Sequence, residues 1–145
     1  MGVRDYIGIP FKHQGRDMDG VDCYGLVHLV YKRERGIILP DVQGYDYSDQ
    51  VRCGYFEAWE KDVDGIISSA HKAWERVYPP HLELYDILLF RRYLEIQAPT
   101  HIGVYTEDDK FLHCTETLPV SLGRLQRYQQ QGMFHSAYRY KGESE

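Results

Sequence analysis

Hydrophobic positions follow a helical period in the first half of the chain and a strand-like period in the second half. The clearest helical stripe falls at Cys23, Leu26, Val27, Val30 and Tyr31. At the N-terminal end of this stripe, Asp22 stands where an N-cap acceptor belongs. The last turn carries cations in the run Lys32-Arg33-Glu34-Arg35. Gly36 then supplies a C′ residue, and Pro40 lies beyond it. The pattern therefore predicts a helix that begins at Cys23 and ends before Gly36.

Two further segments allow a helix, Tyr55–Lys61 and Gly65–Val77. The second carries an apolar stripe that ends at Trp74, and Pro79-Pro80 would stop it. We expect Tyr6–Asp22 to be an ordered loop and Asp41–Ser48 to be irregular.

Short strand patterns dominate after Pro80. The expected strands are Ile87–Phe90, His101–Tyr105, Phe111–Cys114 and Ser136–Tyr140. Glu107-Asp108-Asp109 is a polar turn of hairpin length between the second and third of them. The connections are too short for a doubly wound parallel sheet, so the order of elements predicts an α+β fold with an antiparallel sheet.

Composition indicates one globular domain spanning residues 1–145, with a net charge of −5 and 43% hydrophobic residues. No stretch is long and apolar enough for a membrane span, and the acidic balance argues against nucleic-acid binding. The N-terminus has no apolar h-region, which predicts that no secretory signal is present. Cys23, Cys53 and Cys114 are an odd number without paired spacing, so neither a disulfide scaffold nor a thiolate zinc site is expected.

Candidate chemistry centres on Cys23 in the first turn of the predicted helix, where the helix dipole and free backbone N–H groups favour a thiolate nucleophile. The alternative is a small buried hydrophobic residue, the usual role of a free cysteine. Gly25 interrupts the helix at a cost of about 1 kcal/mol relative to alanine, which suggests that another backbone approaches this turn closely.

Two histidines are candidates for a base and its partner. If Glu107-Asp108-Asp109 is a three-residue loop, His101 and His113 are diagonal neighbours on one sheet face, and His113 could orient the imidazole of His101. A two-residue loop would place them on opposite faces, where each would be an ordinary structural histidine.

A family likeness is carried by separated motifs in a fixed order. They are Gly8-Ile9-Pro10-Phe11, Gly20-Val21-Asp22-Cys23-Tyr24-Gly25-Leu26, Leu84–Phe90, His101-Ile102-Gly103-Val104-Tyr105 and Lys110-Phe111-Leu112-His113. Together they resemble the signature of the NlpC family of papain-like cell-wall cysteine peptidases. The resemblance implies a papain-like α+β fold in which a nucleophile helix packs on an antiparallel sheet. Extra helices would be inserted at about 41–80.

The resemblance also implies a Cys–His–His triad in which Cys23 is the nucleophile, His101 the base and His113 its orienting partner. The backbone N–H of Cys23 would contribute to an oxyanion hole, and Asp22, Phe11 and His13 are further candidates for substrate or oxyanion binding. Family members typically cut peptidoglycan stem peptides between D-γ-glutamate and the diamino acid. No cofactor or metal is implied, and a metal site of Cys23, His101 and His113 is disfavoured because no further residue has ligand spacing.

Two departures concern the residues around the nucleophile. The family commonly has Tyr where this chain has Phe11, and Ser where it has Tyr24. His13-Gln14-Gly15-Arg16-Asp17 replaces a double-Gly turn, a variant that resembles the branch found in long-tailed phages.

We therefore expect a tail-tip protein that is made in the host cytoplasm, joins the virion tail, contacts tail hub proteins and opens the cell wall during DNA delivery. The alternatives are a structural tail protein with unused catalysis and a peptidase or acyltransferase that acts on another tail protein. Aromatic residues in the predicted insertion are either core packing or a docking surface for tail proteins. They are Tyr45, Tyr47, Tyr55, Phe56 and Trp59.

Overall fold

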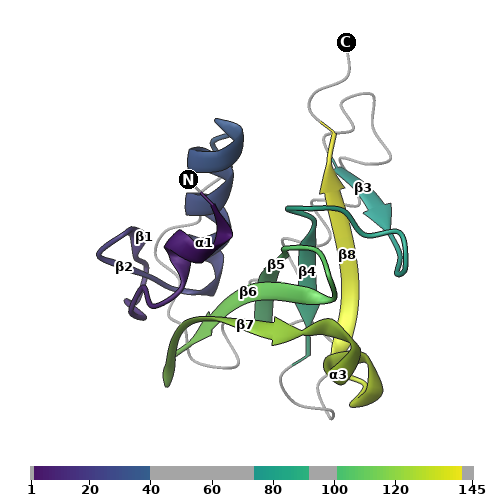
Figure 1. Ribbon diagram of the computed structural model, residues 1–145. Helices are drawn as coiled ribbons and strands as arrows, with labels where there is room; N and C mark the ends of the chain where they lie inside the picture. The colour runs from purple at the N-terminus through teal and green to yellow at the C-terminus, as the bar shows by residue number, and fades with distance from the viewer. Residues whose placement is uncertain (1, 40–73, 92–100, 142–145) are drawn as a thin grey trace.

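A six-stranded antiparallel sheet forms the centre of the protein, with a helix against one of its faces (Figure 1). The computed structural model describes residues 2–39, 74–91 and 101–141. The helical elements are η1 (Val3–Tyr6), α1 (Cys23–Val30), η2 (Tyr31–Arg35) and α3 (Leu125–Gln130). The strands are β1 (Arg16–Asp17), β2 (Gly20–Val21), β3 (Trp74–Val77), β4 (Ile87–Phe90), β5 (His101–Tyr105), β6 (Lys110–Thr115), β7 (Leu118–Arg124) and β8 (Phe134–Tyr140). This arrangement confirms the predicted α+β class.

The helical segment formed by α1 and η2 begins and ends where the sequence signals predict. Asp22 caps it by accepting a hydrogen bond from the backbone N–H of Gly25 at 2.6 Å. The helix continues into the π-helical turn η2 and stops at Gly36, whose φ of +65° suits the left-handed conformation of a C′ glycine. All eight residues of α1 are buried, so tertiary packing stabilises this short helix.

The sheet order is β3-β8-β4-β5-β6-β7, and every neighbouring pair is antiparallel. The predicted strands 87–90 and 101–105 are confirmed, while the other two are longer than expected. In the β5–β6 hairpin Val104 pairs with Leu112, and Thr106 N–H donates to the carbonyl of Lys110. The structure therefore contains a three-residue loop, and this loop selects one of the two strand registers that the sequence left open.

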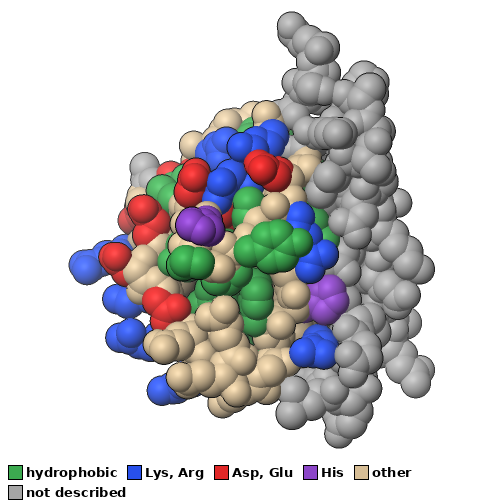
Figure 2. Space-filling model, turned by 90° about the vertical axis from the view of Figure 1, so that its right-hand side faces the viewer, with side chains coloured by type: hydrophobic (Ala, Val, Ile, Leu, Met, Phe, Trp, Pro, Cys, Tyr) green, Lys and Arg blue, Asp and Glu red, His purple; other side chains and the backbone are tan. Residues whose placement is uncertain are grey.

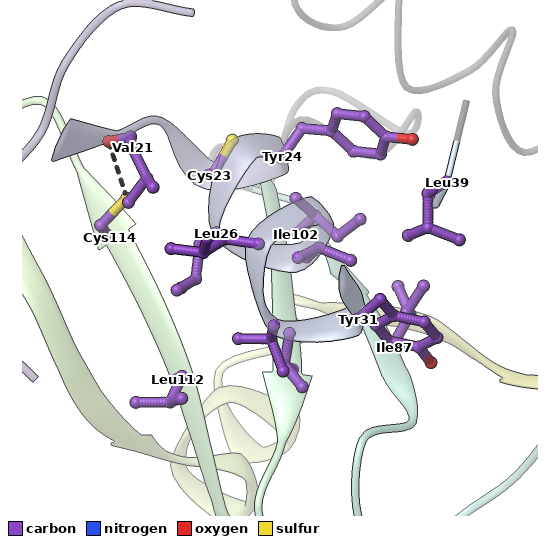
Figure 3. Packing of buried hydrophobic residues seen from close by; sticks show 14 of the residues in the cluster. Val21, Cys23, Tyr24, Leu26, Tyr31, Leu39, Ile87, Ile102, Leu112 and Cys114 are labelled. Carbon is purple, nitrogen blue, oxygen red and sulfur yellow. Dashed lines mark hydrogen bonds between the residues drawn. The ribbon is translucent and has the colours of Figure 1, made fainter. Parts of the chain in front are cut away.

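The two faces of the sheet bury separate hydrophobic clusters. On the α1 side, Ile102 and Val104 of β5 pack with Leu112 and Cys114 of β6 and with the helix (Figure 3). On the α3 side, Phe90 and Phe111 pack with Leu125. Because successive residues of a strand point to opposite faces, His101 and His113 lie on the α3 side.

The predicted helix at 65–77 is wrong for its last four residues, which form strand β3. Trp74 pairs with Tyr140 of β8, and Val77 pairs with Ala137. The two buried residues of β3 belong to different clusters, Trp74 to the α1 side and Val77 to the α3 side. The apolar stripe that ends at Trp74 predicted a helix here, but the sheet buries Trp74 and Val77 on opposite faces.

Other differences lie in segments with weak periodicity. The expected loop at 6–22 contains the two-stranded β1–β2 hairpin, in which Arg16 pairs with Val21. The sequence did not predict β7 or α3.

Several predictions fall outside the described residues: the irregular 41–48, the helix 55–61, most of the helix 65–77, and the aromatic residues of the insertion. Among the helices described, none is long and apolar enough to cross a membrane.

Candidate active site

The first turn of α1 is held by a close backbone contact with the preceding hairpin. A Cβ added to Gly25 would lie 1.9 Å from the carbonyl oxygen of Gly15, closer than any side chain permits. Glycine is therefore required here, in agreement with the close approach that the sequence suggested. Cys23 occupies this turn and is 4% exposed.

Asp22 organises the same turn from a fully buried position. Its Oδ1 accepts hydrogen bonds from Gly25 N–H at 2.6 Å and from the Arg16 guanidinium at 3.0 Å. Its Oδ2 accepts from the backbone N–H of Gln14 at 2.9 Å. Both carboxylate oxygens are thus occupied in tying the loop to the helix, and this is the role in which the structure places Asp22.

His101 and His113 form a buried hydrogen-bonded pair. His101 Nε2 lies 2.9 Å from His113 Nδ1, and the rings meet edge to face with an interplanar angle of 68°. The exposed fractions are 5% and 8%, so water does not compete strongly for this contact. The three-residue loop produces the pairing because it places both residues on one face.

Burial sets the protonation of His113. Desolvation lowers the pKa of His113 from 6.5 to about 4, so this imidazole is neutral at physiological pH. A neutral His113 can carry its proton on Nε2 and accept at Nδ1 the hydrogen bond donated by His101 Nε2–H. In that arrangement His101 Nδ1 keeps a lone pair and can take up a proton. His113 then stabilises the imidazolium that forms.

Two contacts fix the direction of α1 along β5. At the start of the helix, the Cys114 thiol lies 3.7 Å from the carbonyl oxygen of Val21, to which it can donate a hydrogen bond (Figure 3). At the other end, Tyr31 Oη donates a hydrogen bond to the backbone carbonyl of Tyr85. The backbone N–H of Tyr85 donates to the carbonyl of Tyr105 at the end of β5. The first residues of α1 and β5, Cys23 and His101, therefore lie at the same end of the sheet.

The histidine pair projects toward α3, whereas α1 packs on the other face, so Cys23 and His101 share one end of the sheet but belong to elements on different sides of it. The roles of Cys23, His101 and His113 as a triad stay a prediction.

Phe11 and His13 lie beside the β1–β2 hairpin. Phe11 is half-buried against the α1-side cluster and forms an isolated parallel bridge with Val21. His13 is exposed in the turn before β1. Neither position excludes contact with a substrate, and their proposed binding roles stay predictions.

Aromatic residues enclose the histidine pair from the α3 side. Tyr128 of α3 contacts the His113 ring edge to face at 6.0 Å, and it also packs against Phe90 and Phe111 at 5.2 Å. Burial raises the pKa of Tyr128, so the phenol is neutral. A cleft of about 240 Å³ borders the pair, and its lining residues are Phe90, Arg91, His101, His113, Thr115, Tyr128 and Met133.

Sequence reasoning missed Tyr128 and Gly123. A Cβ on Gly123 of β7 would lie 2.7 Å from Phe111 Cζ and 3.1 Å from His113 Nε2, so this glycine leaves room for the histidine ring. The alternation of Leu118, Val120 and Leu122 is the signal that could have predicted β7. Within the described part of the chain, no group of three or more His, Cys, Asp or Glu side chains could hold a metal ion.

Comparison with known proteins identifies the family. A family model for NlpC/P60 proteins matches residues 8–139, which include both the turn that carries Cys23 and the histidine pair. The chain belongs to the NlpC/P60 family. Members of this family are cysteine peptidases or hydrolases. No match was found among curated proteins.

Solved structures share the fold at low sequence identity. The chain is 24% identical to an NLP/P60 protein from Staphylococcus aureus described as similar to a lipoprotein, with a TM-score of 0.60 over 94% of this chain and 38% of that one. NlpC2 from Trichomonas vaginalis gives 20% identity and a TM-score of 0.64, over 95% of this chain and 44% of that one. The NlpC/p60 domain of the peptidoglycan hydrolase SagA gives 18% identity and a TM-score of 0.57, over 94% of this chain and 91% of that domain. The chain thus spans less than half of the first and second structures and nearly all of the SagA domain.

Proposed function

We propose that this NlpC/P60 protein is a cysteine peptidase that hydrolyses amide bonds in peptidoglycan stem peptides, at the D-γ-glutamyl–diaminopimelate bond. The observation that carries the proposal is the buried His101–His113 hydrogen bond at the end of the sheet where α1 begins. The name of SagA as a peptidoglycan hydrolase supports the choice of substrate.

In this proposal His101 Nδ1 takes the proton of the Cys23 thiol, and the thiolate attacks the amide carbonyl carbon. The resulting oxyanion accepts a hydrogen bond from the Cys23 backbone N–H at the start of α1. His101 then gives its proton to the leaving amine, and the carbon–nitrogen bond breaks to leave an acyl-enzyme. Water adds to the acyl carbon after His101 takes its proton, and return of that proton to sulfur releases the acid and the free thiol.

His113 assists each of these proton transfers without reacting. Its neutral Nδ1 accepts from His101 Nε2–H, which holds the imidazole of His101 in one orientation and stabilises its positive charge. Tyr128 and Phe111 keep water away from this contact.

A digest of purified sacculi tests the proposal. The parent, Cys23→Ala and a matched Cys114→Ala variant are incubated with Gram-negative peptidoglycan, and the products are identified by mass spectrometry. We expect the parent and Cys114→Ala to release fragments cut between D-glutamate and diaminopimelate, and Cys23→Ala to release none. Cleavage that survives in Cys23→Ala, or no cleavage by any protein, would contradict the proposal.

We further propose that the peptidase acts at the tip of a phage tail and opens the host wall locally during DNA delivery. The 13–17 segment that replaces a double-Gly turn supports this placement. In that case the protein is made in the host cytoplasm, binds tail hub proteins, and is detected by mass spectrometry in purified virions. Absence from the virion contradicts the tail role and leaves the peptidase proposal intact.

Presence in the virion without any cleavage by intact tails favours a structural tail protein. Phe11, which lacks the usual hydroxyl, is the residue that makes this second function worth testing.

A further inference from the structure

A second cleft adjoins the histidine pair from the side of β7. It has a volume of about 510 Å³, within the range of peptide and ligand sites. His113 and Tyr128 line both this cleft and the smaller one beside His101. The remaining lining residues are Leu118, Ser121, Leu122, Gly123, Arg124, Arg127 and Gln131. We call this cleft the β7–α3 groove.

The charge of the groove is opposite to that of the protein. Of the described residues that line it, Arg124 and Arg127 are basic and none is acidic, although the chain carries a net charge of −5. Neither guanidinium has a carboxylate partner within the described ranges. Asp109 lines a different cleft with Pro79 and Pro80, and its Oδ1 accepts a hydrogen bond from Gln126 N–H.

Two cations on another edge of the molecule are bound to carboxylates of the chain itself. On the side that carries β3 and β8, basic and acidic side chains are interspersed around hydrophobic ones (Figure 2). There Arg139 pairs with Asp86 at 2.9 Å and with Glu83 at 3.2 Å, and Lys141 pairs with Glu75 at 2.9 Å. Arg139 and Lys141 are thus neutralised within the chain, whereas Arg124 and Arg127 have no such partner among the described residues and are available to a ligand.

We propose that Arg124 and Arg127 bind a free carboxylate of the substrate in the β7–α3 groove and make the enzyme selective for acidic peptides. The inference rests on the proposed peptidase function and names the substrate class of the same site. A guanidinium presents paired N–H donors that match the two oxygens of a carboxylate. Ser121 and Gln131 can bind the polar backbone of such a peptide, and Leu118 and Leu122 its apolar parts.

His113 lines the groove and is hydrogen-bonded to His101, so a carboxylate held there lies beside the histidine pair. Because burial keeps His113 neutral, this histidine offers the carboxylate no charge. The arginines are then the cations that distinguish an acid from an amide at this point. A stem peptide whose D-glutamate keeps its α-carboxylate fits this requirement, and the same peptide with a carboxamide does not.

The test uses two synthetic stem peptides, one with a carboxylate and one with a carboxamide at the α position of D-glutamate, and otherwise identical. KM and kcat are measured with both peptides for the parent, Arg124→Gln, Arg127→Gln and the double variant. We expect the parent to prefer the acid about tenfold in kcat/KM, through KM, as the loss of one charged hydrogen bond implies. The double variant should treat the two peptides alike to within about twofold. Arg4→Gln, on the separate helix η1, is the matched control and should keep the full preference.

Binding to Cys23→Ala, followed by calorimetry, separates this inference from the proposed function. Tighter binding of the acid by Cys23→Ala, lost in Cys23→Ala/Arg127→Gln, supports the groove even if the parent cleaves neither peptide, and in that case the peptidase proposal alone fails. Equal cleavage of the acid and the amide peptide by the parent would overturn the proposed carboxylate binding in the groove and would leave the peptidase proposal standing. A preference that survives in the double variant also overturns the assignment to these arginines.

Discussion

Replacement of Gly25 by alanine tests how the turn that carries Cys23 is built. The new Cβ would lie 1.9 Å from the carbonyl oxygen of Gly15, 2.8 Å from Arg16 Nη1 and 3.0 Å from Asp22 Oδ1. Carbon–oxygen contacts are seldom shorter than about 3.3 Å, so the Gly15 backbone must retreat by about 1.4 Å. That movement pulls the loop away from the Asp22 carboxylate, to which Arg16 and the N–H of Gln14 are bound.

The expected change in the free energy of unfolding on Gly25→Ala is the sum of opposing contributions. Alanine is favoured over glycine inside a helix by about 1 kcal/mol. Overpacking costs about 1–3 kcal/mol, and weakening a hydrogen bond to a charged group costs about 1.5–3 kcal/mol. We therefore expect Gly25→Ala to lower the free energy of unfolding by about 2–4 kcal/mol, and Tm by roughly 7–13 °C for a domain of this size.

Differential scanning calorimetry of the parent and Gly25→Ala measures this shift. Gly2→Ala is the control, because a Cβ there meets nothing within 4 Å. If Gly25→Ala melts at or above the parent temperature, helix propensity outweighs the contact with Gly15, and the steric account of this turn is refuted.

Three other predictions concern the groups around the site. Because the pKa of His113 is about 4 in the folded protein against an ordinary 6.5, unfolding takes up a proton between these values, and stability should fall by about 3 kcal/mol as pH drops from 6.5 to 4. Urea denaturation across this pH range should show that His113→Gln lacks this component; an identical pH dependence in parent and variant would contradict it. Asp22→Ala should cost about 3–5 kcal/mol in the same assay because it leaves Arg16 without its partner, while a loss below about 1 kcal/mol would show that the ion pair is dispensable. Tyr128→Phe keeps the ring packing and should retain kcat, whereas Tyr128→Ala opens the histidine pair to water and should lower kcat at least about tenfold; equal rates would mean that enclosure is unimportant.

Local signals in the sequence determined the elements that carry the candidate chemistry. The stripe from Cys23 to Tyr31, the Asp22 cap and Gly36 specify α1, since capping and amphipathic periodicity act within a few residues. Gly25 revealed a close backbone contact because glycine in a helix is unfavourable without such a reason. A short continuous hydrophobic run located β4, and hydrophobic residues at alternate positions located β5.

Tertiary structure alone decided how these elements combine. Hairpin register depends on loop geometry, so only the fold showed that Glu107-Asp108-Asp109 forms a three-residue loop and that His101 meets His113. Pairing with β8 overrode the helical stripe that ends at Trp74, because a sheet edge supplies hydrogen bonds that local periodicity does not encode.

Long-range packing explains the remaining surprises. Tyr128 lies on a six-residue helix too short to form by its own propensity, so α3 exists only against Phe90 and Phe111 of the sheet. The sequence by itself determined which residue types could perform the chemistry and on which local elements they stand. The burial that neutralises His113 and the groove beside it arise from residues far apart in the chain, and therefore only the folded protein determines them.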